Sequence, residues 1–61
     1  MSQLRKLRKG KKISAKELAD NVGISERYVS FLENNERTPS LKVAIKIADF
    51  LECSIEDIFL H

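Results

Sequence analysis

The sequence predicts an all-α fold, a compact five-helix domain that includes all of residues 1–61. Apolar residues recur at spacings of three and four, which is the helical period, and no strand-like alternation of Val, Ile or Thr occurs. Four serines stand where helix-capping residues are expected. The stretches between the expected helices are too short for a linker, a second domain or an internal repeat.

The first helix is expected over residues 2–9, with Leu4 and Leu7 facing inward. Gly10 follows directly and can adopt the left-handed conformation that ends many helices. We therefore predict that the helix terminates at this glycine.

The second helix is expected over Ala15–Val22, opened by a capping box. The Ser14 hydroxyl can accept a hydrogen bond from the amide of residue 17, and the Glu17 side chain can reach back to the amide of Ser14. Ile13 can pack on Leu18 as a hydrophobic staple, which fixes the direction in which the chain enters the helix.

Ser25, Ser40 and Ser54 are expected to cap the remaining three helices. Ile24 and Val29 flank the first of these caps with staple spacing, and two acidic residues follow Ser54, where a helix dipole favours negative charge. The predicted helices cover Glu26–Glu33, Leu41–Leu51 and residues 55–60.

The helical period also selects the side chains expected in the core. They are Leu4, Leu7, Leu18, Ala19, Val22, Ile24, Val29, Leu32, Leu41, Ala44, Ile47, Ala48, Leu51 and Ile58.

Residues 15–34 have the pattern of a tight corner between two helices. Ala19 is small where the helices would cross, and Gly23 permits positive φ in the turn. Five apolar side chains can bury the corner: Leu18, Val22, Ile24, Val29 and Leu32. The sequence therefore predicts a helix-turn-helix.

Composition excludes several kinds of protein. The single cysteine, Cys53, cannot form an intramolecular disulfide, and with only His61 as histidine no zinc-ligand spacing occurs. We expect no metal and no cofactor. Neither a transmembrane stretch nor a signal peptide is recognisable, so we expect a cytoplasmic protein that does not bind membranes.

Positive charge is concentrated near the start of the chain. Six of the eleven Lys and Arg residues lie between Arg5 and Lys12, although the net charge is only +2. Such a stretch attracts nucleic acid or an anionic membrane surface, and it is equally compatible with a solvated helix face.

Three stretches together resemble the helix-turn-helix proteins of the phage Cro and repressor type, also called the xenobiotic-response-element family. They are LRKLRKGKKISAKELADNVGIS, YVSFLENNERTPSL and AIKIADFLECSIEDIF, which cover nearly the whole chain. The resemblance implies a lambda-repressor-like five-helix domain that binds operator DNA as a two-fold dimer and represses or activates transcription.

Within the expected third helix, residues near its amino-terminal end could read bases in the major groove. The candidates are Ser25, Glu26, Arg27, Ser30 and Phe31. Arg27 can donate two hydrogen bonds to guanine. Glu26 can accept a hydrogen bond from cytosine, or it can be an ordinary first-turn acidic residue that interacts favourably with the helix dipole. Phe31 could meet a thymine methyl group or pack against the fourth helix.

Phosphate contacts are expected on both sides of this helix, from helix amino termini, loop residues and a tyrosine hydroxyl. The candidates are Ala15, Lys16, Tyr28, Asn34, Asn35, Arg37, Thr38, Ser40 and Lys42.

Two further expectations come from the family resemblance. Arg8 and Glu33 match a pair that commonly forms a structural salt bridge in the family, so Arg8 is expected to brace the fold. Ala15 stands where the family usually has a phosphate-binding glutamine, which leaves that contact to backbone amides and Lys16.

The last helix is expected to form a homodimer interface. Ile55, Ile58, Phe59 and Leu60 offer more apolar surface than a short terminal helix buries, although Ile55 and Ile58 could instead close the core. A symmetric dimer implies a palindromic operator, with recognition helices about 34 Å apart.

The sequence thus favours a regulator of transcription, expected to be a repressor, that binds double-stranded DNA. The alternative is a protein-interaction module of the same fold with little DNA affinity, as in some antirepressors and antitoxins. No nucleophile and base pair supports an enzyme.

Overall fold

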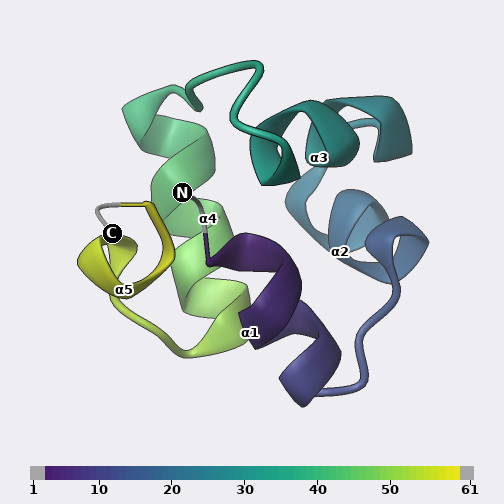
Figure 1. The fold of residues 1–61 in the computed structure, drawn as a ribbon, viewed down its shortest axis with the longest axis vertical. Coiled ribbons are helices and arrows are strands. Elements are labelled where there is room, and N and C mark those ends of the chain that lie inside the picture. The colour runs from purple at the N-terminus through teal and green to yellow at the C-terminus, as the bar shows by residue number, and fades with distance from the viewer. Residues whose placement is uncertain (1–2, 60–61) are drawn as a thin grey trace.

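The computed structural model of the protein describes residues 3–59, which contain five helices and no strand. The helices are α1 (Leu4–Gly10), α2 (Ala15–Val22), α3 (Glu26–Glu33), α4 (Leu41–Leu51) and α5 (Ile55–Phe59) (Figure 1). The all-α prediction is confirmed, and the predicted bounds of α2, α3 and α4 are those observed. Helix α1 begins at Leu4 and ends at Gly10, slightly later than predicted at both ends.

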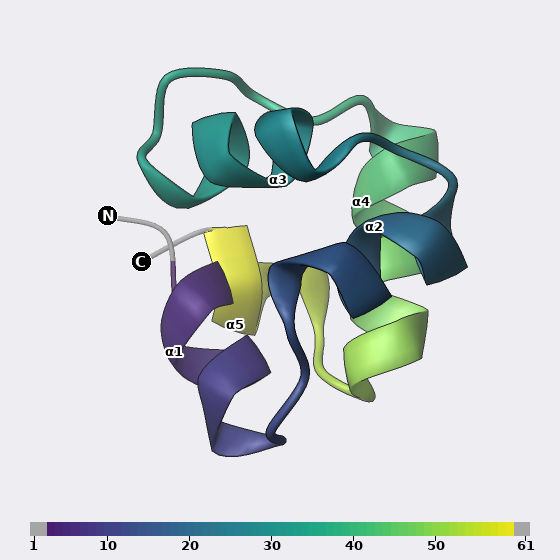
Figure 2. The same cartoon turned by 90° about the vertical axis from the view of Figure 1, so that its right-hand side faces the viewer.

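The helices form a bundle in which α3 occupies an outer position. Helix α2 packs against α3 and α4, while α1 packs against α3 and α5, and α4 against α5. In both Figure 1 and Figure 2, α3 lies at the outside of the bundle. One face of α3 is therefore covered by α1 and α2, and the other is left to solvent.

Serine caps open four of the five helices, as predicted. The hydroxyl oxygens of Ser14, Ser25, Ser40 and Ser54 each accept a hydrogen bond from the backbone amide three residues later, over 3.0–3.2 Å. Such a cap contributes about 1 kcal/mol of stability. The second half of the capping box is absent from the described residues, where the Glu17 carboxylate makes no hydrogen bond to the Ser14 amide.

Helices α1 to α4 are each followed by one residue with positive φ. These residues are Lys12 (φ 59°), Gly23 (φ 84°), Asn35 (φ 59°) and Glu52 (φ 55°). In each case the next amide bonds back to a carbonyl of the last helical turn, which is the Schellman arrangement or a close variant of it. The prediction for Gly23 is confirmed. The prediction for Gly10 is wrong, because that glycine lies inside α1 and Lys12 supplies the left-handed residue.

Eleven of the predicted core residues are buried, which confirms most of the predicted core. They are Leu4, Leu18, Ala19, Val22, Val29, Leu32, Ala44, Ile47, Ala48, Leu51 and Ile58. Burying one such large aliphatic side chain contributes about 1.5–3 kcal/mol. Leu7 and Ile24 are half-buried against this core.

Leu41 is the exception, since it is 71% exposed. It lies on the same face of the helix as Ala44 and Ala48, and the helical period therefore predicts that it belongs to the core. However, it is the first residue of α4, beside an open groove, and no neighbouring helix covers it.

None of the helices within residues 3–59 is long and apolar enough to cross a lipid bilayer. In the same part of the chain, no three His, Cys, Asp or Glu side chains are grouped so that they could hold a metal ion.

Candidate nucleic-acid interface

The corner between α2 and α3 fixes the direction of α3. Gly23 is left-handed, and its amide and that of Ile24 both donate to the Ala19 carbonyl, over 2.8 and 3.0 Å. Ala19 is only 2% exposed, so the small side chain there lies inside the packed corner. Ser25 then caps the new helix two residues after the glycine. Gly23, Ile24 and Ser25, with the Ala19 carbonyl as acceptor, thus hold the start of α3 in place.

Helix α3 has one buried face and one exposed face. Val29 and Leu32 are buried, and Tyr28 is half-buried against the core. Glu26 and Arg27, by contrast, are exposed. Ser25 and Ser30, the other polar residues predicted to read bases, are exposed as well. The structure therefore places these four predicted residues together on the solvent side of α3, which Figure 2 shows at the top of the molecule.

Phe31 has a different environment from the other predicted base-reading residues. It is half-buried, yet it is not among the described side chains that pack against the core cluster. Instead, the guanidinium carbons of Arg27 and Arg37 each lie 5.6 Å from the centre of its ring. Sequence analysis missed this cluster because Arg37 belongs to a loop, although the spacing of four between Arg27 and Phe31 was a readable signal.

The carboxyl-terminal end of α3 is held by a buried ion pair. Arg8 Nε donates to Glu33 Oε2 over 2.7 Å and Arg8 Nη2 to Oε1 over 3.3 Å. Arg8 Nη1 also donates to the Ile13 carbonyl over 2.8 Å. The two side chains are only 9% and 4% exposed. Arg8 therefore ties α3 to α1 and to the turn after α1, and it is not available to DNA.

A second arginine reaches the same carboxylate from the surface. Arg5 Nε donates to Glu33 Oε1 over 3.2 Å, and Arg5 Nη2 donates to the side-chain oxygen of Asn34 over 3.1 Å. The side-chain oxygen of Asn34 is thus engaged within the protein. Its amide nitrogen donates to Ser30 Oγ over 3.5 Å, which leaves one N–H of the amide group without a partner in that contact.

The other residues predicted to contact phosphate differ in exposure. Six of them are exposed: Lys16, Asn35, Arg37, Thr38, Ser40 and Lys42. Ala15 and Tyr28 are half-buried against the core. The backbone amides of Ala15 and Lys16, in the first turn of α2, make no hydrogen bond within residues 3–59, so both can donate to an anion.

Lys16 makes an exposed ion pair one turn along α2. Its Nζ donates to Asp20 Oδ2 over 2.9 Å, with both side chains well exposed. The hydrogen bond from Lys16 to Asp20 and the charge of Asp20 raise the pKa of Lys16 above its ordinary value, and the charge of Glu26 adds to this. Lys16 is therefore fully protonated at neutral pH.

The basic stretch of residues 5–12 does not form one surface with α3. Arg8 is buried, and Arg5 is paired with Glu33. The lysines of this stretch lie on α1, which packs against α3, and on the turn after α1, which Figure 2 shows at the opposite end of the molecule from α3. All of these lysines are exposed to solvent.

The predicted dimer residues of α5 need one correction. Ile58 is 0% exposed, so it closes the core and offers no surface to a partner. Ile55 and Phe59 are half-buried, while Leu60 lies outside the described residues. A single terminal helix can bury more apolar surface than expected here, because α5 packs against both α1 and α4.

Exposed apolar surface lies instead at the start of α4. Leu41 is 71% exposed and Ile45, one turn later, is 43% exposed. Beside them an apolar groove of about 320 Å³ is lined by Thr38, Pro39, Leu41, Ala44, Ile55 and Phe59. Sequence analysis missed this surface because Leu41 had been assigned to the core.

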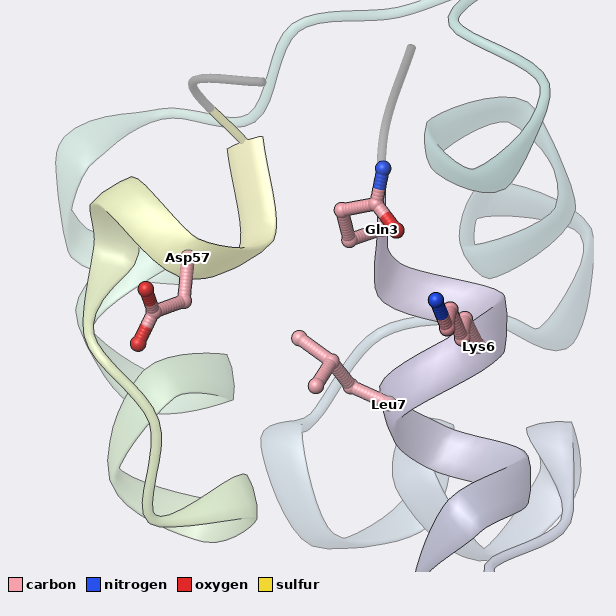
Figure 3. A pocket seen from close by; sticks show the side chains of 4 residues that line it. All are labelled: Gln3, Lys6, Leu7 and Asp57. Carbon is pink, nitrogen blue, oxygen red and sulfur yellow. The ribbon is translucent and has the colours of Figure 1, made fainter.

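A pocket of about 390 Å³ lies between α1 and α5, lined by Gln3, Lys6, Leu7 and Asp57 (Figure 3). In Figure 3, Leu7 projects from α1 towards α5, which carries Asp57. None of these four residues belongs to the predicted DNA interface, and they provide no pair of nucleophile and base.

The corner, the capped exposed helix and the buried brace at its far end agree with one known family. The sequence profile of the helix-turn-helix family matches residues 4–58, which is nearly the whole chain. The chain belongs to this family. It is the Cro and repressor type of helix-turn-helix protein, whose members are regulators of transcription and not enzymes.

Three archaeal relatives support the assignment. An uncharacterised HTH-type transcriptional regulator from Archaeoglobus fulgidus is 44% identical over 48 residues, which are 79% of this chain and 68% of the relative. One from Methanocaldococcus jannaschii is 39% identical over 49 residues, covering 80% and 74% of the two chains. Another from A. fulgidus is 36% identical over 59 residues, covering 97% and 84%.

Proposed function

We propose that this helix-turn-helix protein binds a palindromic operator as a homodimer in the cytoplasm and represses transcription, with α3 in the major groove. The observation that carries the proposal is the exposed amino-terminal half of α3. Ser25, Glu26, Arg27 and Ser30 are all solvent-exposed there. A major groove admits one α-helix, and residues at the amino-terminal end of that helix reach base edges.

In this arrangement Arg27 is the principal base-reading residue. It makes no ion pair within residues 3–59, so both of its terminal nitrogens can donate to guanine O6 and N7. Glu26 accepts a hydrogen bond from cytosine N4, which narrows the range of sequences bound, and its charge disfavours phosphate at the same place.

Phosphate contacts flank α3 on both sides. On one side lie the first-turn amides of α2 and the Lys16 ammonium group, whose pairing with Asp20 is solvent-exposed and easily exchanged for a phosphate. On the other side lie the exposed side chains of Arg37, Thr38 and Lys42. These contacts set the register of the protein on the duplex and supply most of the salt-dependent affinity.

A second copy of the chain is the proposed occupant of the apolar surface on α4 and α5. Leu41 lines the groove, and Ile45 is exposed one turn later on α4. Thr38, which also lines the groove, belongs to the loop expected to contact phosphate. This continuity between the groove and the DNA interface favours a partner that binds the same duplex. Sedimentation equilibrium is expected to show a dimer that Leu41→Glu dissociates, with Lys46→Glu as the control on the same helix.

Selection of bound fragments from random duplex DNA, followed by a salt titration of the best fragment, tests the proposal. We expect a palindromic consensus and an affinity that falls steeply with salt concentration. The alternative is a protein-interaction module of the same fold. Absence of any selected consensus, with weak binding to every fragment even at low salt, would favour that alternative.

A further inference from the structure

Two arginines share one aromatic ring on the exposed side of α3. The guanidinium carbons of Arg27 and Arg37 are each 5.6 Å from the centroid of the Phe31 ring, within the range of a cation–π interaction. Arg27 lies one helical turn before Phe31 on α3, whereas Arg37 lies in the loop after the helix. The ring therefore connects a helix residue with a loop residue.

The backbone after α3 brings Arg37 to this ring. Asn35 adopts a left-handed conformation with φ of 59°, which turns the chain back over the last helical turn. The amides of Glu36 and Arg37 then donate to the carbonyl of Phe31 itself, over 2.8 and 3.4 Å. The position of the Arg37 side chain is thus set by the way the helix ends.

Charge and burial show that the cluster is not a core feature. Phe31 is half-buried, yet it does not pack against the core cluster of the described residues. The two guanidinium groups therefore shield part of its ring from solvent. Neither arginine forms an ion pair within residues 3–59, where the three ion pairs involve Arg5, Arg8 and Lys16. Two positive charges held on one ring without a carboxylate present a site for an anionic ligand.

We propose that Phe31 is a positioning residue that holds Arg27 and Arg37 as a pair, one directed at a base edge and the other at the neighbouring phosphate. The inference rests on the proposed function and gives Phe31 a role other than contact with a thymine methyl group. Pre-ordering both side chains lowers the entropy lost when they bind DNA. The ring acts through the arginines and makes no essential contact with DNA.

The free protein provides the first test, by NMR without DNA. The Phe31 ring is expected to shift the side-chain protons of both Arg27 and Arg37 upfield. Phe31→Leu is expected to abolish both shifts, whereas Phe31→Tyr, which keeps the ring, is expected to retain them. Unshifted arginine protons in the wild type would overturn the proposal, and this result does not depend on whether the protein binds DNA.

The second test is a set of double-mutant cycles with a DNA fragment selected by the wild-type protein. Phe31→Leu alone is expected to weaken binding about two- to fivefold for each arginine it releases. In the Arg27→Ala, Arg37→Ala double variant the same change is expected to have almost no effect. Because Phe31→Leu removes no charge, the salt dependence of binding is expected to stay as in the wild type. Phe31→Tyr is expected to bind as well as the wild type.

Additive effects of Phe31→Leu and the arginine substitutions would contradict the proposal. So would a changed base preference at a thymine position, since this would indicate direct contact by the ring. Thermal unfolding of each variant shows whether it is folded, and Phe31→Tyr provides the comparison if Phe31→Leu is unstable. If the wild type selects no fragment at all, the proposed function fails, while the NMR test of the arginine pair still stands.

Discussion

The two ends of α3 differ sharply in how they are held. At the carboxyl-terminal end the Glu33 side chain is 4% exposed and receives hydrogen bonds from Arg8 and Arg5. At the amino-terminal end Glu26 and Arg27 are exposed, and neither has an ion pair within the described part of the chain. One end of the helix is thus part of the structure of the domain, and the other is available to a ligand.

This difference shows how a small protein can fix one end of a helix and expose the other. A buried ion pair is strongly destabilising when one partner is removed, because the remaining charge stays buried. At the other end of α3, the exposed side chains of Glu26 and Arg27 make no ion pair within residues 3–59 and can contact a ligand. Substitutions at the two ends are expected to change different properties of the protein.

The largest expected effect is on stability, from Arg8→Ala. Loss of this side chain leaves Glu33 buried with only the exposed Arg5 as partner, and we expect the free energy of unfolding to fall by about 3–5 kcal/mol. Urea denaturation followed by circular dichroism measures it. The matched control is Arg5→Ala, which removes a half-exposed partner of the same carboxylate and is expected to cost less than about 1 kcal/mol. Equal effects of the two substitutions would contradict the difference between the buried and exposed partners.

The next largest effect is on binding, from Arg27→Ala at the opposite end. We expect affinity for the selected operator to fall by about 1–3 kcal/mol per recognition helix, with the preference for one base relaxed. The unfolding free energy is expected to change by less than about 0.5 kcal/mol. Lys9→Ala removes an exposed cation from α1 and serves as the control in a fluorescence anisotropy titration. A loss of affinity from Lys9→Ala as large as that from Arg27→Ala would indicate binding governed by total charge alone.

Alanine substitutions at the two glycines are expected to change the stability of the fold in opposite directions, by smaller amounts. Gly23 precedes the exposed end of α3 with φ of 84°, so Gly23→Ala is expected to destabilise the protein by about 1 kcal/mol or more. Apart from the adjacent residues and, for Gly10, the backbone of its own helix, a Cβ atom at either glycine would meet no atom within 4 Å, so backbone conformation decides the outcome. Gly10 is helical, and Gly10→Ala is expected to stabilise by up to about 1 kcal/mol. Shifts of the same sign in thermal unfolding would contradict this assignment of the turn.

The smallest effect concerns the ion pair beside the exposed end of α3. Asp20 raises the pKa of Lys16, so Asp20→Asn is expected to lower that pKa in an NMR titration of the Lys16 side chain. Because the folded-state pKa is the raised one, any contribution to stability is present at neutral pH. It is lost only as the pH rises through that pKa, above the ordinary value of 10.5. An unchanged Lys16 pKa in the variant would show that the pair does not form in solution.

Local signals in the sequence were sufficient to predict most of the fold. Each serine cap uses a hydrogen bond only three residues long, and Gly23 is the residue type that the left-handed turn prefers. The left-handed conformations of Lys12 and Glu52 could not be predicted in this way, because these residue types rarely adopt positive φ.

Errors in the candidate site arose where tertiary contacts decide the environment. Leu41 and Ile58 both fit an apolar period, yet one is exposed and the other is buried according to which helices lie beside them. The cluster around Phe31 depends on the path of the loop to Arg37, which no spacing in the sequence reveals. In contrast, the positions exposed on α3 followed directly from the predicted helix and its buried stripe.

Parallel selections from random duplex DNA, with the wild-type protein and with Arg27→Ala, test the central claim most directly. If the exposed end of α3 reads bases, the wild type selects a palindrome, and the variant loses its preference at one symmetry-related pair of positions while keeping the flanking pattern. An identical consensus from both proteins would contradict the claim.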